Sequence, residues 1–322
     1  MRAALMFPGQ GCQYIGMCKS LIKKSDKARQ IFRAANDVLS FNLVKMVLEG
    51  NIRELMLTKH AQPAVVTASY AFYHAYLETT ESEPVCAIGH SLGEISALIA
   101  AGTIDFEDGV NFAAQRGSIM QEAAAEKNGC AGVVLDVDIN TVQAIVKDIC
   151  QRDYAAITGY NSPKQFLVAG THKAISELEE RVDEAGGDYI AFRMIPMKEG
   201  APYHSELISF IVPSMEDIIG RMTFKDPKFD IISTVTGSLI EVDELPKVLA
   251  MQLLKPVIWS QALEKVAVLK PDCIIDIGPQ QIMRNLVQET LKVPKALAFD
   301  DDDDRKNIEK MAKRFLMKEA TA

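Results

Sequence analysis

Residues 86–98 read Cys86-Ala87-Ile88-Gly89-His90-Ser91-Leu92-Gly93-Glu94-Ile95-Ser96-Ala97-Leu98. The apolar start of this stretch predicts a buried strand, and the part from Gly93 onward predicts a helix. The chain must turn sharply between them, in the pattern Gly-x-Ser-x-Gly. Such a turn strains the serine backbone and lifts its hydroxyl to the edge of the sheet, where the N–H groups of the next helix also point. Ser91 is therefore a candidate nucleophile, and a plain turn is the alternative interpretation.

Composition sets limits on the class of protein. The chain has 322 residues, of which 48% are hydrophobic and 24% charged, as expected for a soluble globular protein of one large or two medium domains. A net charge of −8 argues against a nucleic-acid-binding protein. The six cysteines show neither C-x-x-C pairs nor metal-ligand spacing, which predicts reduced thiols and no metal site. No apolar run is long enough to cross a membrane, so we expect a cytoplasmic protein.

Upstream of this stretch, an apolar strand at Ala3–Phe7 leads into the glycine-rich loop that carries Gln10. A loop at the carboxyl edge of a sheet is a common place for a binding site, although a simple connection is the alternative. Downstream, the helix predicted at Phe106–Ala123 carries Arg116 among small and apolar neighbours. A guanidinium in such surroundings either reaches solvent or is held for an anion.

The pattern changes near residue 127. Between residues 127 and 196 the expected order is strand, helix, strand, strand, helix, strand, which is typical of a ferredoxin-like subdomain. We therefore predict a large α/β domain with a parallel sheet, formed by residues 1–126 and 197–322, with a small subdomain inserted at 127–196. Asn161 lies in a predicted tight turn of that subdomain, so turn formation is its simplest role.

The chain then returns to the large domain through a loop that contains Tyr203 and His204. A helix is predicted to follow at 206–221, and His204 precedes it, where a titratable imidazole is exposed and chemically useful. Near the end of the chain, the acidic run Asp300–Asp304 precedes a last amphipathic helix. We interpret this run as a solvated helix cap without a catalytic role.

Taken together, these residues resemble one family, the malonyl-CoA:acyl carrier protein transacylases. The matching pieces follow the family's order along nearly the whole chain, and are Phe7 to Gln13, Gln62-Pro63-Ala64, Gly89 to Glu94, Gln115-Arg116-Gly117, Asn161 to Gln165, Ala201 to Ser205, Gln252 to Trp259, and Ile277-Gly278-Pro279. The resemblance implies a large α/β-hydrolase-like domain interrupted by a ferredoxin-like subdomain, with the active site in the cleft between them.

The resemblance also implies a role for individual residues. Ser91 would be the acyl nucleophile, and His204 its general base and later its acid. A backbone carbonyl at Gln252, in place of an aspartate, would orient the imidazole. The N–H groups of Gln10 and Leu92 would form the oxyanion hole.

The same resemblance assigns substrate contacts. Arg116 would bind the free carboxylate of a malonyl group. Tyr203 resembles the aromatic residue of malonyl-selective members, which implies malonyl in preference to methylmalonyl. The cleft would be lined by Gln62, His90, Asn161 and Tyr203. Three departures from the family pattern are Cys12 in place of serine, Gln280 in place of glycine, and Gly159-Tyr160 before Asn161; none of them removes a catalytic group.

The implied activity is ping-pong transfer of malonyl from malonyl-CoA to the phosphopantetheine thiol of an acyl carrier protein, in fatty acid or polyketide synthesis. We expect a monomer that needs no cofactor or metal, since the carrier protein brings the phosphopantetheine. The alternatives are an acyl-thioester hydrolase of the same fold, a transferase that prefers another acyl-CoA, and a non-enzymatic binding module. The presence of Arg116 favours transfer over hydrolysis, and the presence of Ser91 and His204 argues against a binding module.

Overall fold

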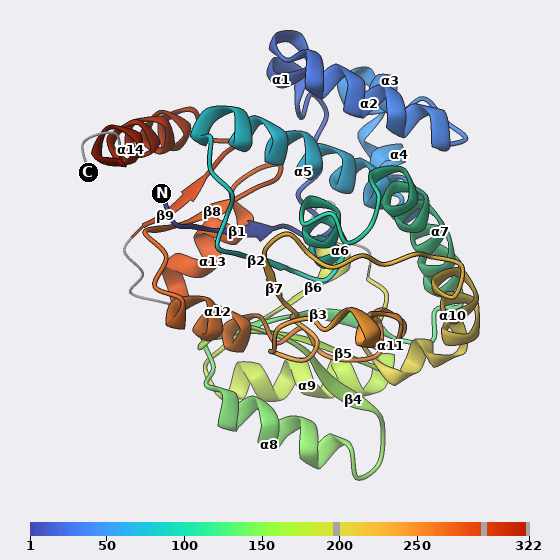
Figure 1. The fold of residues 1–322 in the computed structure, drawn as a ribbon. Coiled ribbons are helices and arrows are strands. Elements are labelled where there is room, and N and C mark those ends of the chain that lie inside the picture. Colours follow the sequence, from blue (N-terminus) through green and yellow to red (C-terminus); the bar gives the residue numbers. More distant parts are fainter. Residues whose placement is uncertain (196–199, 291–294, 320–322) are drawn as a thin grey trace.

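The computed structural model describes residues 1–195, 200–290 and 295–319 (Figure 1). These residues form two β-sheets, each with its own helices. No helix in the described part of the chain has the length and apolar character needed to span a membrane. The two sheets confirm the predicted fold class, a parallel α/β sheet accompanied by a small antiparallel one.

The larger sheet is parallel throughout and has the strand order β7-β2-β1-β8-β9. Its strands are β1 (Ala3–Phe7), β2 (Cys86–Gly89), β7 (Asp230–Ile232), β8 (Cys273–Asp276) and β9 (Ala296–Ala298). The three inner strands, β2, β1 and β8, are completely buried, as expected when helices cover both faces of a parallel sheet. Adjacent parallel strands end at the same edge, so the loop after β1 and the turn after β2 lie side by side.

Helices of the large domain surround this sheet (Figure 1). They are α1 (Lys19–Lys24), α2 (Asp26–Val38), α3 (Leu43–Glu49), α4 (Ile52–Met56), α5 (Thr58–Thr80), α6 (Leu92–Ala100), α7 (Phe106–Ala125), α10 (Val212–Ile219), α11 (Leu245–Met251), α12 (Trp259–Val268), α13 (Ile282–Thr290) and α14 (Asp302–Glu319), with short 3₁₀ turns η2 (Glu206–Ile211) and η3 (Val242–Glu244). The expected helix at 206–221 is in fact η2 followed by α10. Pro213 explains the break, because proline lacks an N–H and begins the new helix.

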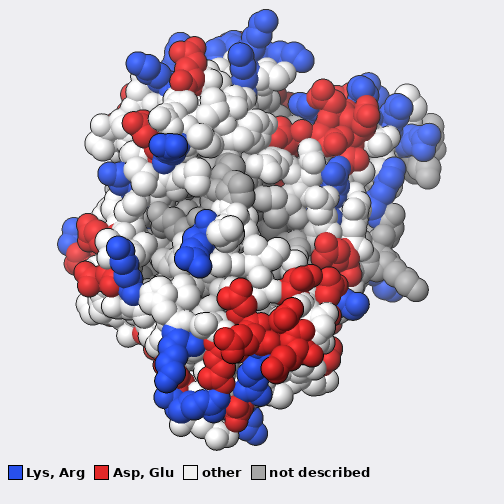
Figure 2. Space-filling model, turned by 180° about the vertical axis from the view of Figure 1, so that it is seen from behind, with Lys and Arg blue, Asp and Glu red and all other residues white. Residues whose placement is uncertain are grey.

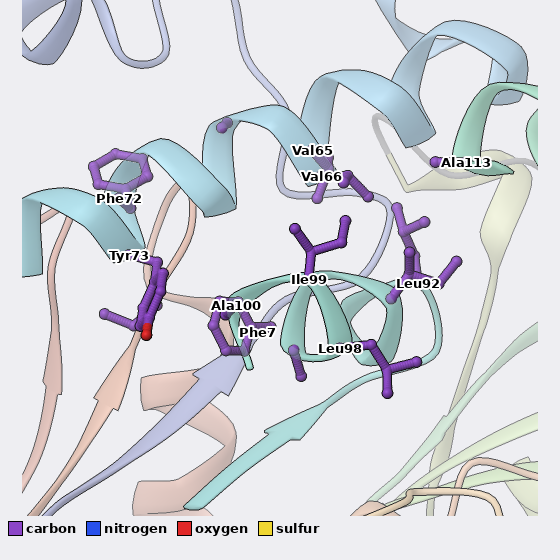
Figure 3. Packing of buried hydrophobic residues seen from close by; sticks show 14 of the residues in the cluster. Phe7, Val65, Val66, Phe72, Tyr73, Leu92, Leu98, Ile99, Ala100 and Ala113 are labelled. Carbon is purple, nitrogen blue, oxygen red and sulfur yellow. The ribbon is translucent and has the colours of Figure 1, made fainter. Parts of the chain in front are cut away.

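Helix α6, which follows the turn at Ser91, lies at the centre of the hydrophobic core. All nine of its residues are buried. Figure 3 shows Ile99 directed toward Val65 and Val66 of α5, and Ala100 close to Phe7 of β1. Each large side chain buried here contributes about 1.5–3 kcal/mol to stability. This packing fixes the first turn of α6, and therefore the position of Ser91.

The smaller sheet is antiparallel and has the strand order β4-β5-β3-β6. Its elements are β3 (Cys130–Leu135), α8 (Ile139–Ile149), β4 (Ala155–Ser162), β5 (Gln165–Gly170), α9 (His172–Glu184) and β6 (Asp188–Ala191), followed by the 3₁₀ turn η1 (Phe192–Met194). This is the expected strand and helix order. The predicted boundary between residues 196 and 197 lies outside the described residues.

The small subdomain is joined to the large domain by main-chain hydrogen bonds as well as by its two linkers. Strand β4 pairs with the segment before α12: Val257 donates its N–H to Thr158 O at 3.0 Å, and Tyr160 donates to Val257 O at 2.8 Å. These two bonds form a short parallel seam between the domains. The seam holds one edge of the small sheet against the large domain.

The acidic run at the start of α14 is more than a solvated cap. Asp300 accepts hydrogen bonds from the Tyr14 hydroxyl and the Gln280 N–H, and Asp304 pairs with Arg284 at 2.7 Å. These contacts connect α14 with the loops after β1 and β8. The expectation of a purely solvated role is therefore wrong for Asp300 and Asp304, because both side chains are tied to neighbouring elements.

Candidate active site

Ser91 occupies the turn between β2 and α6. Its backbone has φ 52° and ψ −109°, a conformation that residues with a side chain rarely adopt and that costs about 1–3 kcal/mol. The flanking glycines make the turn possible. A Cβ on Gly89 would lie 2.1 Å from the backbone nitrogen of Glu94, and one on Gly93 would lie 2.0 Å from Phe7 O. The strand, the turn and α6 can therefore pack closely only with glycine at both positions.

His204 lies against this serine although the two are 113 positions apart. Its Nε2 is 2.8 Å from Ser91 Oγ. Its Nδ1 is 2.8 Å from Gln252 O and 3.1 Å from Lys255 O. Because carbonyl oxygens only accept hydrogen bonds, Nδ1 carries the proton and Nε2 presents its lone pair to the serine hydroxyl. The imidazole is therefore oriented as a general base.

The protonation of His204 suits that role. Burial, together with the positive charge of Arg116, lowers the pKa of His204 to about 4, and the two carbonyl contacts oppose this shift. The imidazole is consequently neutral at pH 7 and able to accept a proton.

Arg116 of α7 forms the floor of the site. Only 1% of it is exposed, and its Nη1 and Nη2 donate to Gln62 Oε1 at 2.7 Å and to Gln252 Oε1 at 3.0 Å. Both partners are neutral, and no carboxylate of the described residues forms an ion pair with this guanidinium. Burial lowers the pKa of Arg116 to about 10, which leaves it charged at neutral pH. The site therefore contains a buried cation without a counter-ion in contact.

Gln252 connects the three groups described so far. Its backbone carbonyl holds His204, its Oε1 accepts from Arg116, and its Nε2 donates to Ser91 O at 3.2 Å. Nε2 also approaches Glu94 Oε2 at 3.4 Å. One glutamine thus fixes Ser91, His204 and Arg116 relative to one another. From the sequence, only the backbone role of Gln252 was expected.

Glu94 is a site residue that the sequence analysis did not single out. Its side chain is fully buried behind Gln252, and Thr234 Oγ1 lies 3.2 Å from its Oε2. Burial raises the pKa of this carboxyl. A glutamate, the one charged residue of the mainly apolar helix α6, was the available signal, because such a residue is rarely buried without a polar partner.

The two residues predicted to form an oxyanion hole lie beside Ser91. Leu92 is the first residue of α6, where the N–H groups of the helix point outward. Gln10 lies in the loop after β1, and its side-chain Nε2 donates to Thr58 Oγ1 at 3.0 Å. Both residues line the same small cavity as Ser91 and His204. Their N–H groups as oxyanion donors remain a prediction.

This acyl cavity has a volume of about 80 Å³. The large domain supplies its reacting and charged groups, and the small subdomain supplies uncharged ones. Its lining residues are Gly9, Gln10, His90, Ser91, Leu92, Arg116, Met120, Thr158, Leu167, Phe192, Tyr203 and His204. A larger groove of about 350 Å³ shares five of these residues and continues between the small sheet and α13.

The predicted cleft-lining residues divide into two groups. His90 and Asn161 both line the groove and contact each other across it, with His90 Nε2 donating to Asn161 Oδ1 at 2.9 Å. Tyr203 lines the acyl cavity, and its hydroxyl donates to Met120 O at 3.0 Å. Gln62, in contrast, is fully buried behind Arg116 and is absent from the cavity lining. The structure therefore corrects the expectation for Gln62, whose amide is used to hold the guanidinium.

Comparison with known proteins agrees with this geometry. The sequence pattern of the acyl transferase domain family matches residues 5–313. A malonyl CoA-acyl carrier protein transacylase of Bacillus subtilis (strain 168) is 31% identical over 304 residues, which cover 94% of each chain. The corresponding protein of Escherichia coli (strain K12) is 28% identical over 299 residues, covering 92% of this chain and 96% of that one.

Two solved structures have the same fold. The transacylase of Clostridium perfringens is 28% identical and has a TM-score of 0.91, covering 99% of this chain and 100% of that one. A malonyl-transacylase solved in complex with its type II polyketide synthase acyl carrier protein is 28% identical and has a TM-score of 0.90, covering 96% of this chain and 99% of that one.

Proposed function

Since this chain belongs to the acyl transferase domain family, we propose that it transfers a malonyl group from malonyl-CoA to the phosphopantetheine thiol of an acyl carrier protein. In the first half-reaction, Ser91 Oγ attacks the thioester carbonyl while His204 Nε2 takes the hydroxyl proton. The negative oxygen that forms is stabilised by the N–H groups of Gln10 and Leu92. The carbon–sulfur bond then breaks, and the CoA sulfur leaves with the proton from His204.

The second half-reaction repeats these steps in reverse with a different thiol. The carrier's pantetheine thiol gives its proton to His204 and attacks the malonyl ester on Ser91. The ester bond breaks, and Ser91 Oγ recovers the proton. Because both thioesters have nearly equal energies, the enzyme needs no external energy source, and the proposed reaction uses no resident cofactor or metal.

The observation that carries this proposal is the buried guanidinium of Arg116. It lines the acyl cavity with Ser91 and is held by two neutral amide oxygens. A malonyl carboxylate would pair with it, whereas an acetyl group would leave the cation unpaired, at a cost of about 3–5 kcal/mol. The proposed substrate is therefore a dicarboxylic acyl group small enough for a cavity of about 80 Å³.

The groove beside the cavity is suited to the pantetheine arm. Its walls are mainly apolar, with Val133 and Leu167 from the small sheet facing Leu286 of α13. The side-chain amides of Asn161 and Gln165 also line it, and they match the two amide groups of the arm. We propose that both CoA and the carrier deliver their sulfur to Ser91 through this groove.

Surface charge limits where the carrier docks. Figure 2 shows acidic side chains gathered over the lower half of the molecule, where the small subdomain lies. Helix α9 alone exposes Glu179, Glu180, Asp183 and Glu184. Because acyl carrier proteins are acidic, we propose that the carrier avoids this face. We place the reaction in the cytoplasm, in keeping with six cysteines that are all free thiols.

The direct test is covalent labelling. The protein is mixed with malonyl-CoA, without a carrier, and its intact mass is measured. We expect one malonyl group on the wild type, released when a carrier protein with its phosphopantetheine arm is added. If the adduct is lost to water without the carrier as fast as it is lost when the carrier is added, the protein is a hydrolase instead.

A further inference from the structure

The loop after β1, which carries Gln10, is held from one side by the loop after β8. Gly278 packs so closely on Pro8 that a Cβ there would lie 2.3 Å from Pro8 Cγ. Two residues further on, Gln280 Nε2 donates a hydrogen bond to Cys12 O at 3.1 Å. The first contact, at Pro8, lies two residues before Gln10, and the second, at Cys12, lies two residues after it. The loop after β8 therefore holds both ends of the segment that carries the proposed oxyanion donor.

The backbone of Gln280 is unusual for a glutamine. It has φ 63°, in the left-handed region that glycine and asparagine adopt more readily. The conformation is fixed by its own N–H, which donates to Asp300 Oδ2 at 2.8 Å. That carboxylate also accepts the Tyr14 hydroxyl at 2.9 Å, so it ties the same two loops together. A glycine at this position would keep the backbone contact but would lose the side-chain contact with Cys12.

The segment around Gln10 is held both from within and by the loop after β8. Gly9 and Gly11 flank the residue, and Gly11 has φ 110°, so the glycines themselves impose little conformational preference. Within the loop, the Gly11 N–H donates to Gln13 Oε1 at 2.8 Å, and the contact of Gln280 with Cys12 acts in addition to this bond. The side-chain amide of Gln10 donates to Thr58 Oγ1 at 3.0 Å. Cys12 and Gln280, two of the positions at which the sequence departs from the family pattern, thus contact each other beside the site.

We infer that Gln280 is a positioning residue for the oxyanion site. Its amide holds the carbonyl of Cys12 and thereby aligns the N–H of Gln10 with the carbonyl oxygen of the substrate. The inference rests on the proposed function for the role of Gln10. It concerns the rate of the chemical step and not the binding of malonyl, because the contacts of Arg116 lie on other elements.

Two variants test this role: Gln280→Gly and Gln280→Asn. Both residues tolerate the left-handed backbone, and neither has a side chain long enough to reach Cys12 O. The matched control is Gln281→Ala, which removes the neighbouring glutamine, whose Oε1 accepts from Arg284. The probe is a neutral fluorophosphonate. The Ser91 hydroxyl gives its proton to His204, its Oγ bonds to phosphorus, and the phosphorus–fluorine bond breaks to release fluoride. The phosphoryl oxygen needs the same N–H donors.

We expect the second-order rate of phosphonylation to fall about tenfold in both Gln280 variants, and kcat for malonyl transfer to fall in parallel, since a displaced oxyanion donor weakens only the transition state. KM for malonyl-CoA should remain within about twofold of wild type. The unfolding temperature should remain within about 2 °C of wild type, because relief of backbone strain by glycine offsets the lost hydrogen bond. The control should match wild type in every measurement.

Phosphonylation within about twofold of wild type in both variants would overturn the inference. A slower reaction accompanied by a fall of more than about 5 °C in unfolding temperature would also overturn it, because the residue would then act on stability as a whole. The phosphonate reaction does not depend on malonyl recognition. Failure of the proposed function, seen as no malonyl adduct on the wild type, is therefore distinguishable from failure of this inference.

Discussion

The two sides of the acyl cavity differ in what they contribute. The large domain supplies Ser91, His204 and Arg116, which are reactive or charged and held by buried amides and carbonyls. The small subdomain supplies Thr158, Leu167 and Phe192, none of which is charged. This difference indicates that the reactive and charged groups come from the large domain, whereas the small subdomain contributes uncharged walls to the cavity and the groove. Changes on the large-domain side should therefore affect kcat and acyl choice, and changes on the other side should affect mainly KM.

The largest effect is expected for Ser91→Ala, which removes the proposed nucleophile. Malonyl transfer should fall by about 10⁴-fold or more, and no malonyl adduct should be seen by intact mass. Ser96→Ala is the matched control, because Ser96 is buried on the same helix and lies outside the cavity. An adduct that persists on the Ser91 variant would show that another residue carries the acyl group.

Arg116→Ala should have the next largest effect, on acyl choice. Loss of the guanidinium removes the proposed partner of the malonyl carboxylate, so the ratio of malonyl to acetyl loading should fall by about 10²–10³. Arg116→Lys keeps the charge without the paired N–H geometry. Its malonyl-to-acetyl ratio should therefore lie between those of the wild type and Arg116→Ala. Competition between malonyl-CoA and acetyl-CoA measures the ratio. If it is unchanged in the alanine variant, Arg116 does not select the acyl group.

The dependence of rate on pH should reveal the buried base. As the proposed general base, His204 must be neutral to accept the serine proton, and its pKa is lowered to about 4 by burial and by Arg116. At pH 5.5 the wild type should retain nearly its full rate of phosphonylation by a fluorophosphonate, whereas an imidazole with the ordinary pKa of about 6.5 would lose about tenfold. In Arg116→Ala one cation is lost, so the pKa of His204 rises and the acid limb of the profile moves to higher pH. An acid limb near pH 6.5 in the wild type would contradict this account.

The smallest effect is expected on the small-subdomain side, for Asn161→Ala. This change breaks the contacts with His90 and Gln165 in the groove. We expect KM for malonyl-CoA to rise about threefold to fivefold, with kcat nearly unchanged, because the residue contacts no reacting atom. Asn140→Ala, on the exposed face of α8, serves as the control. A fall in kcat as large as the rise in KM would contradict the view that the small subdomain affects mainly substrate binding.

The sequence predicted the parts of the site that depend on local pattern. The turn at Ser91 follows from glycine spacing and from the switch from strand to helix, and the strand and helix order of 127–196 follows from periodicity. Assigning His204 and Gln252 to one site needed the family resemblance, since nothing local indicates that residues this far apart in the chain meet. The side-chain role of Gln252 was missed because it depends on Arg116, Ser91 and Glu94 converging around one amide.

Other differences have similar physical causes. Gln62 was expected in the cleft, but its amide is needed behind Arg116, where a buried cation requires acceptors. Strand β9 was not expected, since a three-residue strand carries too little pattern to be distinguished from a loop. One continuous helix was expected at 206–221 from the apolar spacing. The structure has a 3₁₀ turn followed by a shorter helix, because Pro213 lacks the N–H that a continuous helix would need there.

The main-chain seam between β4 and Val257 has a consequence for protein engineering. Both hydrogen bonds join main-chain groups, so exchange of residues 127–196 for the equivalent piece of a relative would preserve them as long as the new strand keeps its place beside Val257. A hybrid enzyme therefore needs a residue other than proline at the positions of Val257 and Tyr160, because proline has no N–H to donate. The seam would then tolerate inserts of different side-chain sequence.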